Sequence, residues 1–118
     1  MVDQEFSIND CGVVLNPAQH SYVVKNYMAS TRIAVVEDKW YAGYNVFLPN
    51  GGCSVPVQLG EDYFSTEKDA LNYSVECIKE YLQDKFNDDN KKVADVSLSL
   101  YNFVVGKKKK GQLMLFNI

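Results

Sequence analysis

The chain has 118 residues, enough for one ordinary domain with a single core and too few for two. Hydrophobic residues make up 47% and charged residues 23%, with 8 Tyr, 6 Phe and 1 Trp, which excludes the apolar-poor composition of a disordered chain. The formal net charge of -3 excludes a protein that grips a phosphate backbone with its whole surface. Cations are concentrated at one place, a lysine run at residues 107–110.

Targeting signals and cysteine content indicate the cellular compartment in which the protein works. No stretch approaches the roughly 20 apolar residues that a transmembrane helix needs, and "MVDQEFSIND" at the start lacks the basic and apolar regions of a signal peptide. Three cysteines, Cys11, Cys53 and Cys77, are odd in number and stand in apolar surroundings, which suits unpaired thiols in a reducing compartment. We therefore expect a cytoplasmic protein with no membrane partner.

The first half of the chain reads as β-structure. Within residues 1–30, "CGVVL" predicts a short strand at residues 13–15, whereas "SYVVKNYM" is ambiguous. "RIAVV" and "WYAGYNVFL" predict two antiparallel strands joined by a turn at "EDK". "PNGG" holds an Asn-Gly pair, favoured where both central turn residues need positive φ, and predicts that "CSVPVQL" returns as a third strand. Pro56 cannot donate to a ladder, so that strand is an edge or carries a bulge.

The second half reads as helical. "STEKDALNYSVECIKEYLQDKF" predicts an amphipathic helix, because Thr66 and Asp69 have the spacing of a capping box and the first turn is acidic. Its apolar residues recur at spacings of three and four and form one stripe: Leu71, Val75, Ile78, Leu82 and Phe86.

A second helix is expected in "VADVSLSLYNFVV", although the alternation in "VSLSLYNFV" also suits a strand. Gly106 is expected to end this element. The residues that suit helical spacing are Val93, Val96, Leu100 and either Phe103 or Val104.

These elements predict an α+β fold, a two-layer sandwich with an antiparallel sheet of three or four strands and one or two helices packed on one face. We expect an N-terminal segment at residues 1–30, an α+β domain at residues 31–106, and a basic linker with a peptide tail at residues 107–118. At least some of the aromatic residues between positions 40 and 47 are expected on the sheet face away from the helices.

Catalysis finds little support in the sequence. His20 has no carboxylate pattern near it and no cysteine at a recognisable spacing. The chain also lacks the spacings of zinc, phosphate-binding and dinucleotide-binding motifs, and "NDDN" lacks the ligand spacing of a calcium loop. We therefore expect a protein that is not an enzyme and that has no cofactor and no metal.

The C-terminal peptide carries a specific signal. "QLMLF" at residues 112–116 resembles the glutamine-leucine-any-leucine-phenylalanine pentapeptide by which bacterial polymerases, repair proteins and replication-associated factors dock on the DNA sliding clamp, the β subunit of DNA polymerase III. Four of the five positions match. The resemblance implies that Leu115 and Phe116 enter an apolar pocket, that Leu113 covers its rim and that Gln112 forms a hydrogen bond at the far end.

Two features of the tail have alternative interpretations. The peptide can instead be a terminal strand that pairs with the sheet through Leu113 and Leu115. The lysine run can contact DNA phosphates beside a docked clamp or act as a spacer extended by self-repulsion.

The segment at residues 40–84 is similar to small sheet-plus-helix modules in antitoxin-like and partition-associated proteins of bacterial mobile elements. Together the resemblances imply a non-enzymatic adaptor of bacterial, phage or plasmid DNA metabolism whose partner is the sliding clamp, and the lysine run makes DNA a candidate second partner. The alternative is a single-stranded nucleic-acid-binding module, in which aromatic side chains of the sheet stack on bases and the lysine run neutralises phosphates. Its candidate residues are Trp40, Tyr44, Lys107, Lys108, Lys109 and Lys110.

Overall fold

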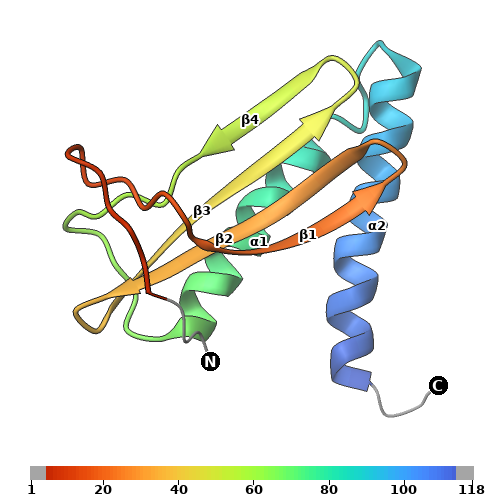
Figure 1. Ribbon diagram of the computed structural model, residues 1–118. Coiled ribbons are helices and arrows are strands. Elements are labelled where there is room, and N and C mark those ends of the chain that lie inside the picture. Colours follow the sequence, from red (N-terminus) through yellow and green to blue (C-terminus); the bar gives the residue numbers. More distant parts are fainter. Residues whose placement is uncertain (1–4, 114–118) are drawn as a thin grey trace.

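The structure is a computed structural model, which describes the backbone of residues 5–113 and the side chains of residues 5–106. Four strands form one antiparallel sheet in the order β1-β2-β3-β4, and two helices pack on one of its faces (Figure 1). The predicted two-layer α+β architecture is confirmed. The elements are β1 (Ala18–Val24), β2 (Tyr27–Val36), β3 (Lys39–Leu48), β4 (Gly51–Val55), α1 (Glu67–Gln83) and α2 (Lys91–Leu113).

Tight turns join the strands into a meander. The predicted turn at "EDK" is a two-residue loop in which Glu37 and Asp38 both have positive φ, at 52° and 66°, which matches the twist of a hairpin. The Asn-Gly prediction is wrong by one residue, because Gly51 already pairs with Leu48 and the loop is formed by Pro49 and Asn50. Gly51 still carries the unusual backbone conformation, with φ at 122°.

The N-terminal segment differs from the expectation. The predicted strand at residues 13–15 is wrong: Val13 and Val14 form only isolated bridges, to Gln58 and Ile8, because Gly12 turns the chain at φ 81° immediately before them. The ambiguous "SYVVKNYM" is a β-hairpin, in which a loop at Lys25 and Asn26 joins β1 to β2. The sheet therefore begins at β1, inside the first thirty residues.

The two faces of the sheet have different neighbours, and we call them the helix-covered face and the open face. On β3 the even-numbered residues point to the helices, since Trp40 packs with Ala70 of α1, and Val46 and Leu48 belong to the main core. The odd-numbered residues, among them Tyr41 and Phe47, lie on the open face.

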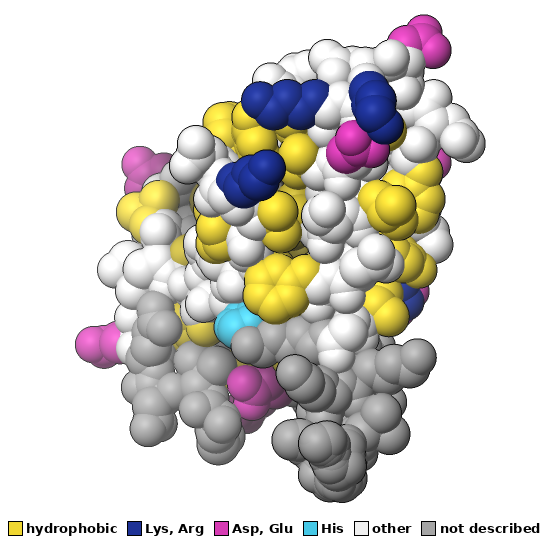
Figure 2. Space-filling view, turned by 90° about the vertical axis from the view of Figure 1, so that its right-hand side faces the viewer, with side chains coloured by type: hydrophobic (Ala, Val, Ile, Leu, Met, Phe, Trp, Pro, Cys, Tyr) yellow, Lys and Arg dark blue, Asp and Glu magenta, His cyan; other side chains and the backbone are white. Residues whose placement is uncertain are grey.

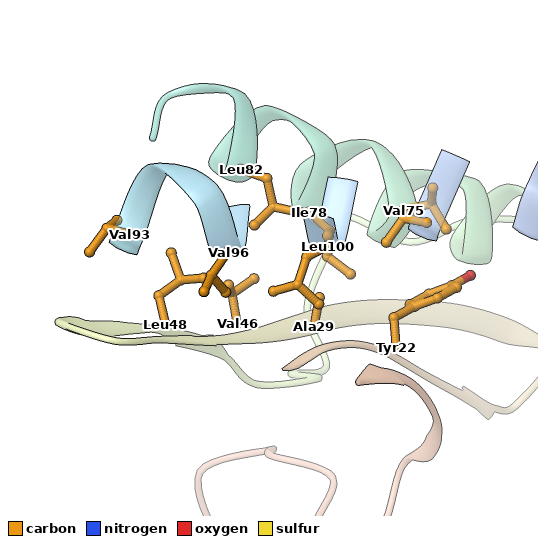
Figure 3. Packing of buried hydrophobic residues seen from close by; sticks show 11 residues of the cluster. Tyr22, Ala29, Val46, Leu48, Val75, Ile78, Leu82, Val93, Val96 and Leu100 are labelled. Carbon is orange, nitrogen blue, oxygen red and sulfur yellow. The ribbon is translucent and has the colours of Figure 1, made fainter. Parts of the chain in front are cut away.

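The main core lies between the sheet and both helices (Figure 3). It contains residues from three strands and from both helices: Tyr22, Ala29, Val46, Leu48, Val75, Ile78, Leu82, Val93, Val96, Leu100 and Val104. A smaller cluster of Val14, Ala34, Tyr41 and Val57 covers one end of the open face with the segments before β1 and after β4.

The predicted N-terminus of α1 is confirmed, because the backbone N–H of Asp69 donates to Thr66 Oγ1 at 3.1 Å. The predicted apolar stripe holds in its centre, where Val75, Ile78 and Leu82 are buried. At its ends it is wrong: Leu71 is 37% exposed, and Phe86 lies beyond the last residue of the helix.

In the first turns of α1 the residues that face the sheet are the small Ala70 and Ser74, and not Leu71. The Ser74 hydroxyl donates to the Gly43 carbonyl at 2.7 Å, so α1 approaches β3 closely at a position where neither residue has a large side chain. This close contact explains why the first turn of the stripe does not follow the spacing of the largest apolar residues.

The preference for a helix in the last element is confirmed. Asn90 caps α2, since its Oδ1 accepts hydrogen bonds from the backbone N–H groups of Lys92 at 3.0 Å and Val93 at 3.4 Å. Of the two alternatives at the end of the stripe, Val104 is fully buried and Phe103 is 40% exposed. No helix in the described part of the chain is long and apolar enough to cross a membrane.

Candidate functional site

Helix α2 carries the chain from the core to the C-terminal peptide. The prediction that Gly106 ends the helix is wrong, because α2 continues to Leu113. Gly106 does not adopt the left-handed conformation that a glycine cap requires, and the lysines after it are good helix formers. Figure 1 shows the last turns of α2, in blue, extending beyond the sheet.

The apolar stripe of α2 ends with Val104. Continued at spacings of three and four, it would fall on Lys107, Lys108 and Gly111, none of which can fill a hydrophobic core. The nine residues after Val104, up to Leu113, span about 14 Å of helix. The sequence after Val105 therefore has no apolar residue until the pentapeptide itself.

The pentapeptide residues fall partly within the described chain. Gln112 and Leu113 are the last two residues of α2, while Leu115 and Phe116 lie outside the described residues, as do the side chains of the lysine run. The terminal-strand interpretation required Leu113 to pair with the sheet, and Leu113 is helical instead. The geometry thus brings the first two motif residues to the end of a helix.

The open face carries a row of polar side chains that the sequence analysis did not identify. The pairing register places one polar residue of each strand side by side: Ser21, Ser30, Asn45 and Ser54. The hydroxyls of Ser21 and Ser30 are 2.8 Å apart, and Arg32 Nη1 donates to Ser54 Oγ at 3.3 Å. Arg32 Nε is buried and has no hydrogen-bond partner among the described residues. The alternation of Ser30 and Arg32 in "MASTRIAVV" is the sequence signal that could have revealed this row.

Two residues assigned to nucleic-acid binding do not lie on the open face. Trp40 is only 7% exposed and packs against Ile33 and Ala70, and Tyr44 is on the same helix-covered side beside Cys53. The prediction that Trp40 and Tyr44 stack on bases is therefore wrong. Because side chains alternate along β3, Trp40 and Tyr44 must lie on the same face of the sheet. The sequence did not show which of the two faces the helices cover. Phe47, 52% exposed, is the aromatic residue of β3 that remains available on the open face.

The structure does not form a catalytic pair of His20 with Cys53. His20 lies on β1 and Cys53 on β4, the two opposite edges of the sheet, so about 14 Å of strand spacing separates their backbones. Burial raises the pKa of the Cys53 and Cys77 thiols, which holds them protonated and unactivated as nucleophiles. Within the described residues no group of three or more His, Cys, Asp or Glu is placed to hold a metal ion.

Comparison with protein-family models, with curated proteins and with solved structures finds no match to this chain. The chain's own residues therefore carry the argument about its function.

Proposed function

We propose that this protein is an adaptor of bacterial or phage DNA metabolism that docks on the DNA sliding clamp through Gln112, Leu113, Leu115 and Phe116. The observation that supports the proposal is the position of the pentapeptide: it begins at the end of α2, eight positions after Val104, the last residue of that helix in the main core. Because the pentapeptide starts after the part of α2 that packs in the core, a partner can bind it without disturbing the packing of the domain.

The energetics favour a weak contact. Burial of Leu115 and Phe116 contributes about 1.5 to 3 kcal/mol each, and part of this is offset by the ordering of the peptide. A docked peptide is extended, so the end of α2 has to unwind. Gly111 reduces the cost, because glycine destabilises a helix by about 1 kcal/mol relative to alanine. A micromolar dissociation constant, about -8 kcal/mol, is expected.

The lysine run has a consistent place in this proposal. It directly precedes Gly111 and the pentapeptide, so docking brings four cations close to the DNA that a sliding clamp encircles. Their contribution is an attraction to phosphates that falls as salt is added. Binding to a clamp without DNA should depend on the pentapeptide and only weakly on these lysines.

Deletion of residues 112–118 tests the proposal. The shortened chain should keep its circular dichroism spectrum and thermal midpoint, because the deleted residues follow the last buried position of α2, and it should no longer be captured by immobilised clamp. A variant with the lysine run changed to glutamines is the control and should still be captured. Capture of the shortened chain would overturn the proposal.

A second candidate, binding of single-stranded nucleic acid on the open face, is favoured by one observation. Phe47 is exposed there, and Arg32 on the neighbouring strand lies on the same face, where its Nη1 donates to Ser54 Oγ at 3.3 Å. In this candidate a base stacks on Phe47 and the guanidinium of Arg32 contacts a phosphate. In that case affinity for single-stranded DNA falls with added salt and with either Phe47→Ala or Arg32→Gln; no binding at low salt would reject it.

A further inference from the structure

The two edges of the sheet are protected to different degrees. β4 has five residues, begins with two glycines and ends immediately before Pro56, features that blunt an edge against pairing. β1 has seven residues, "AQHSYVV", without a proline or a formally charged side chain. A strand of this kind at the edge of a sheet is a template for pairing with another strand.

The outer backbone groups of β1 can be assigned from its hairpin. Val24 and Tyr27 close a two-residue loop and exchange their backbone hydrogen bonds with each other. Along β1 the backbone groups of successive residues point alternately toward β2 and away from it. The N–H and C=O groups of Gln19, Ser21 and Val23 therefore point away from β2. Within residues 5–113, β1 makes no backbone hydrogen bond outside its ladder with β2.

Apolar surface borders this edge. The ring of His20 lies edge-on to Tyr22 with centroids 4.9 Å apart, and Tyr22 in turn meets Phe103 of α2 at 5.5 Å. Phe103 is 40% exposed and Val23 is 53% exposed. Figure 2 shows hydrophobic side chains above the histidine and basic side chains at the upper end of the same face.

We propose that β1 pairs with β1 of a second copy of this chain, antiparallel and about a two-fold axis, so that two four-stranded sheets join into one continuous sheet. The outward N–H and C=O groups of one β1 must face the outward groups of the other. The register in which the two strands overlap over their full length places Ser21 opposite Ser21 of the second copy. Gln19 then faces Val23 of the second copy. The interface is isologous, with each contact made twice.

Charge at the two ends of β1 favours a second copy over other occupants. In this register Lys25 lies opposite Pro17 of the second copy, beside Asn16, whose Nδ2 donates to the Glu5 backbone carbonyl at 3.0 Å. Each end of the paired strands therefore holds a lysine of one copy and, held there by its backbone, a glutamate of the other. Between these ends the strand has no formal charge to desolvate. The paired strands thus have opposite charges at their two ends and no formal charge between them.

This inference does not depend on clamp docking. If both hold, a dimer offers two pentapeptides to a ring-shaped partner, and avidity raises the apparent affinity without a new contact.

Sedimentation velocity over a concentration series tests the pairing with three variants of the full chain. Ser21→Lys and Ser21→Glu each place like charges opposite one another at the axis, and each should be monomeric where the unmodified chain is a dimer. An equimolar mixture of the two places lysine opposite glutamate and should form dimers again. Ser54→Lys is the matched control, since Ser54 is an exposed serine in the same polar row on the opposite edge, and this variant should stay dimeric.

Three results would overturn the proposal. One is an unmodified chain that stays monomeric at every concentration. This includes the case in which the chain dimerises only after residues 107–118 are removed, because the tail and not a second copy would then cover the edge of β1. Another is a mixture of the Ser21 variants that does not reassociate although both melt like the unmodified chain. The third is loss of the dimer in Ser54→Lys, which would assign the interface to β4.

Discussion

Replacement of Leu100 by alanine measures how firmly α2 is packed on the sheet. Leu100 is fully buried in the main core, where Figure 3 shows it beside Ile78 and close to the strands. The substitution removes three carbons, worth about 2.4 kcal/mol at about 0.8 kcal/mol each. The unfilled cavity adds to this, and we expect a loss of about 3 to 4 kcal/mol in the free energy of unfolding.

Leu98→Ala is the matched control, because it makes the same change two positions away on the same helix. Leu98 is 47% exposed, so about half of its side chain is already in water and no closed cavity forms. The expected loss is about 1 kcal/mol or less. Urea unfolding followed by circular dichroism gives both values, and the slope with urea should be the same in the two variants. Equal losses in the two variants would refute the packing described for α2.

Three further predictions concern α1, β3 and the thiols. Thr66→Ala removes the hydroxyl that caps α1 by accepting from the Asp69 N–H. It should lower the free energy of unfolding by about 1 kcal/mol, measured by urea unfolding, and no loss would contradict the cap. Gly43→Ala brings a Cβ against the backbone of Val55 and Pro56, with Pro56 atoms at 2.8 Å, and should lower the thermal midpoint more than Thr66→Ala does. Cys53 and Cys77 have raised pKa values in the folded state, so their alkylation should need a higher pH than in the urea-unfolded chain. The stabilisation linked to these thiols is present below their unfolded pKa and is lost as the pH rises through the folded pKa; coincident alkylation profiles would contradict the burial.

The sequence predicted the elements in which one signal dominates. In α1 the capping pair and the central apolar residues agree, and both were confirmed. The turn at Glu37 and Asp38 was found because the flanking strands have strong β-branched and aromatic patterns. Gly106 misled the prediction of a helix end, because a glycine ends a helix only when the backbone turns left-handed there, and nothing in the local sequence shows whether it does.

The faces of the sheet could not be assigned from sequence alone. Trp40 and Phe47 differ in parity along β3, so one of them must face the helices, and both are equally suited to a core or to an exposed surface. The deciding contact is Ala70 against Trp40, which joins residues thirty positions apart. The edge position of β1 likewise depends on the whole strand order. The pentapeptide is the opposite case, since its signal lies entirely in five consecutive residues.

The central claim is that the C-terminal peptide docks on a sliding clamp, and calorimetric titration of a bacterial clamp with the purified chain tests it most directly. The unmodified chain should bind with a micromolar dissociation constant. A Leu115→Ala/Phe116→Ala variant with the same thermal midpoint should show no binding. Equal binding by both chains, or no binding by either, would contradict the account.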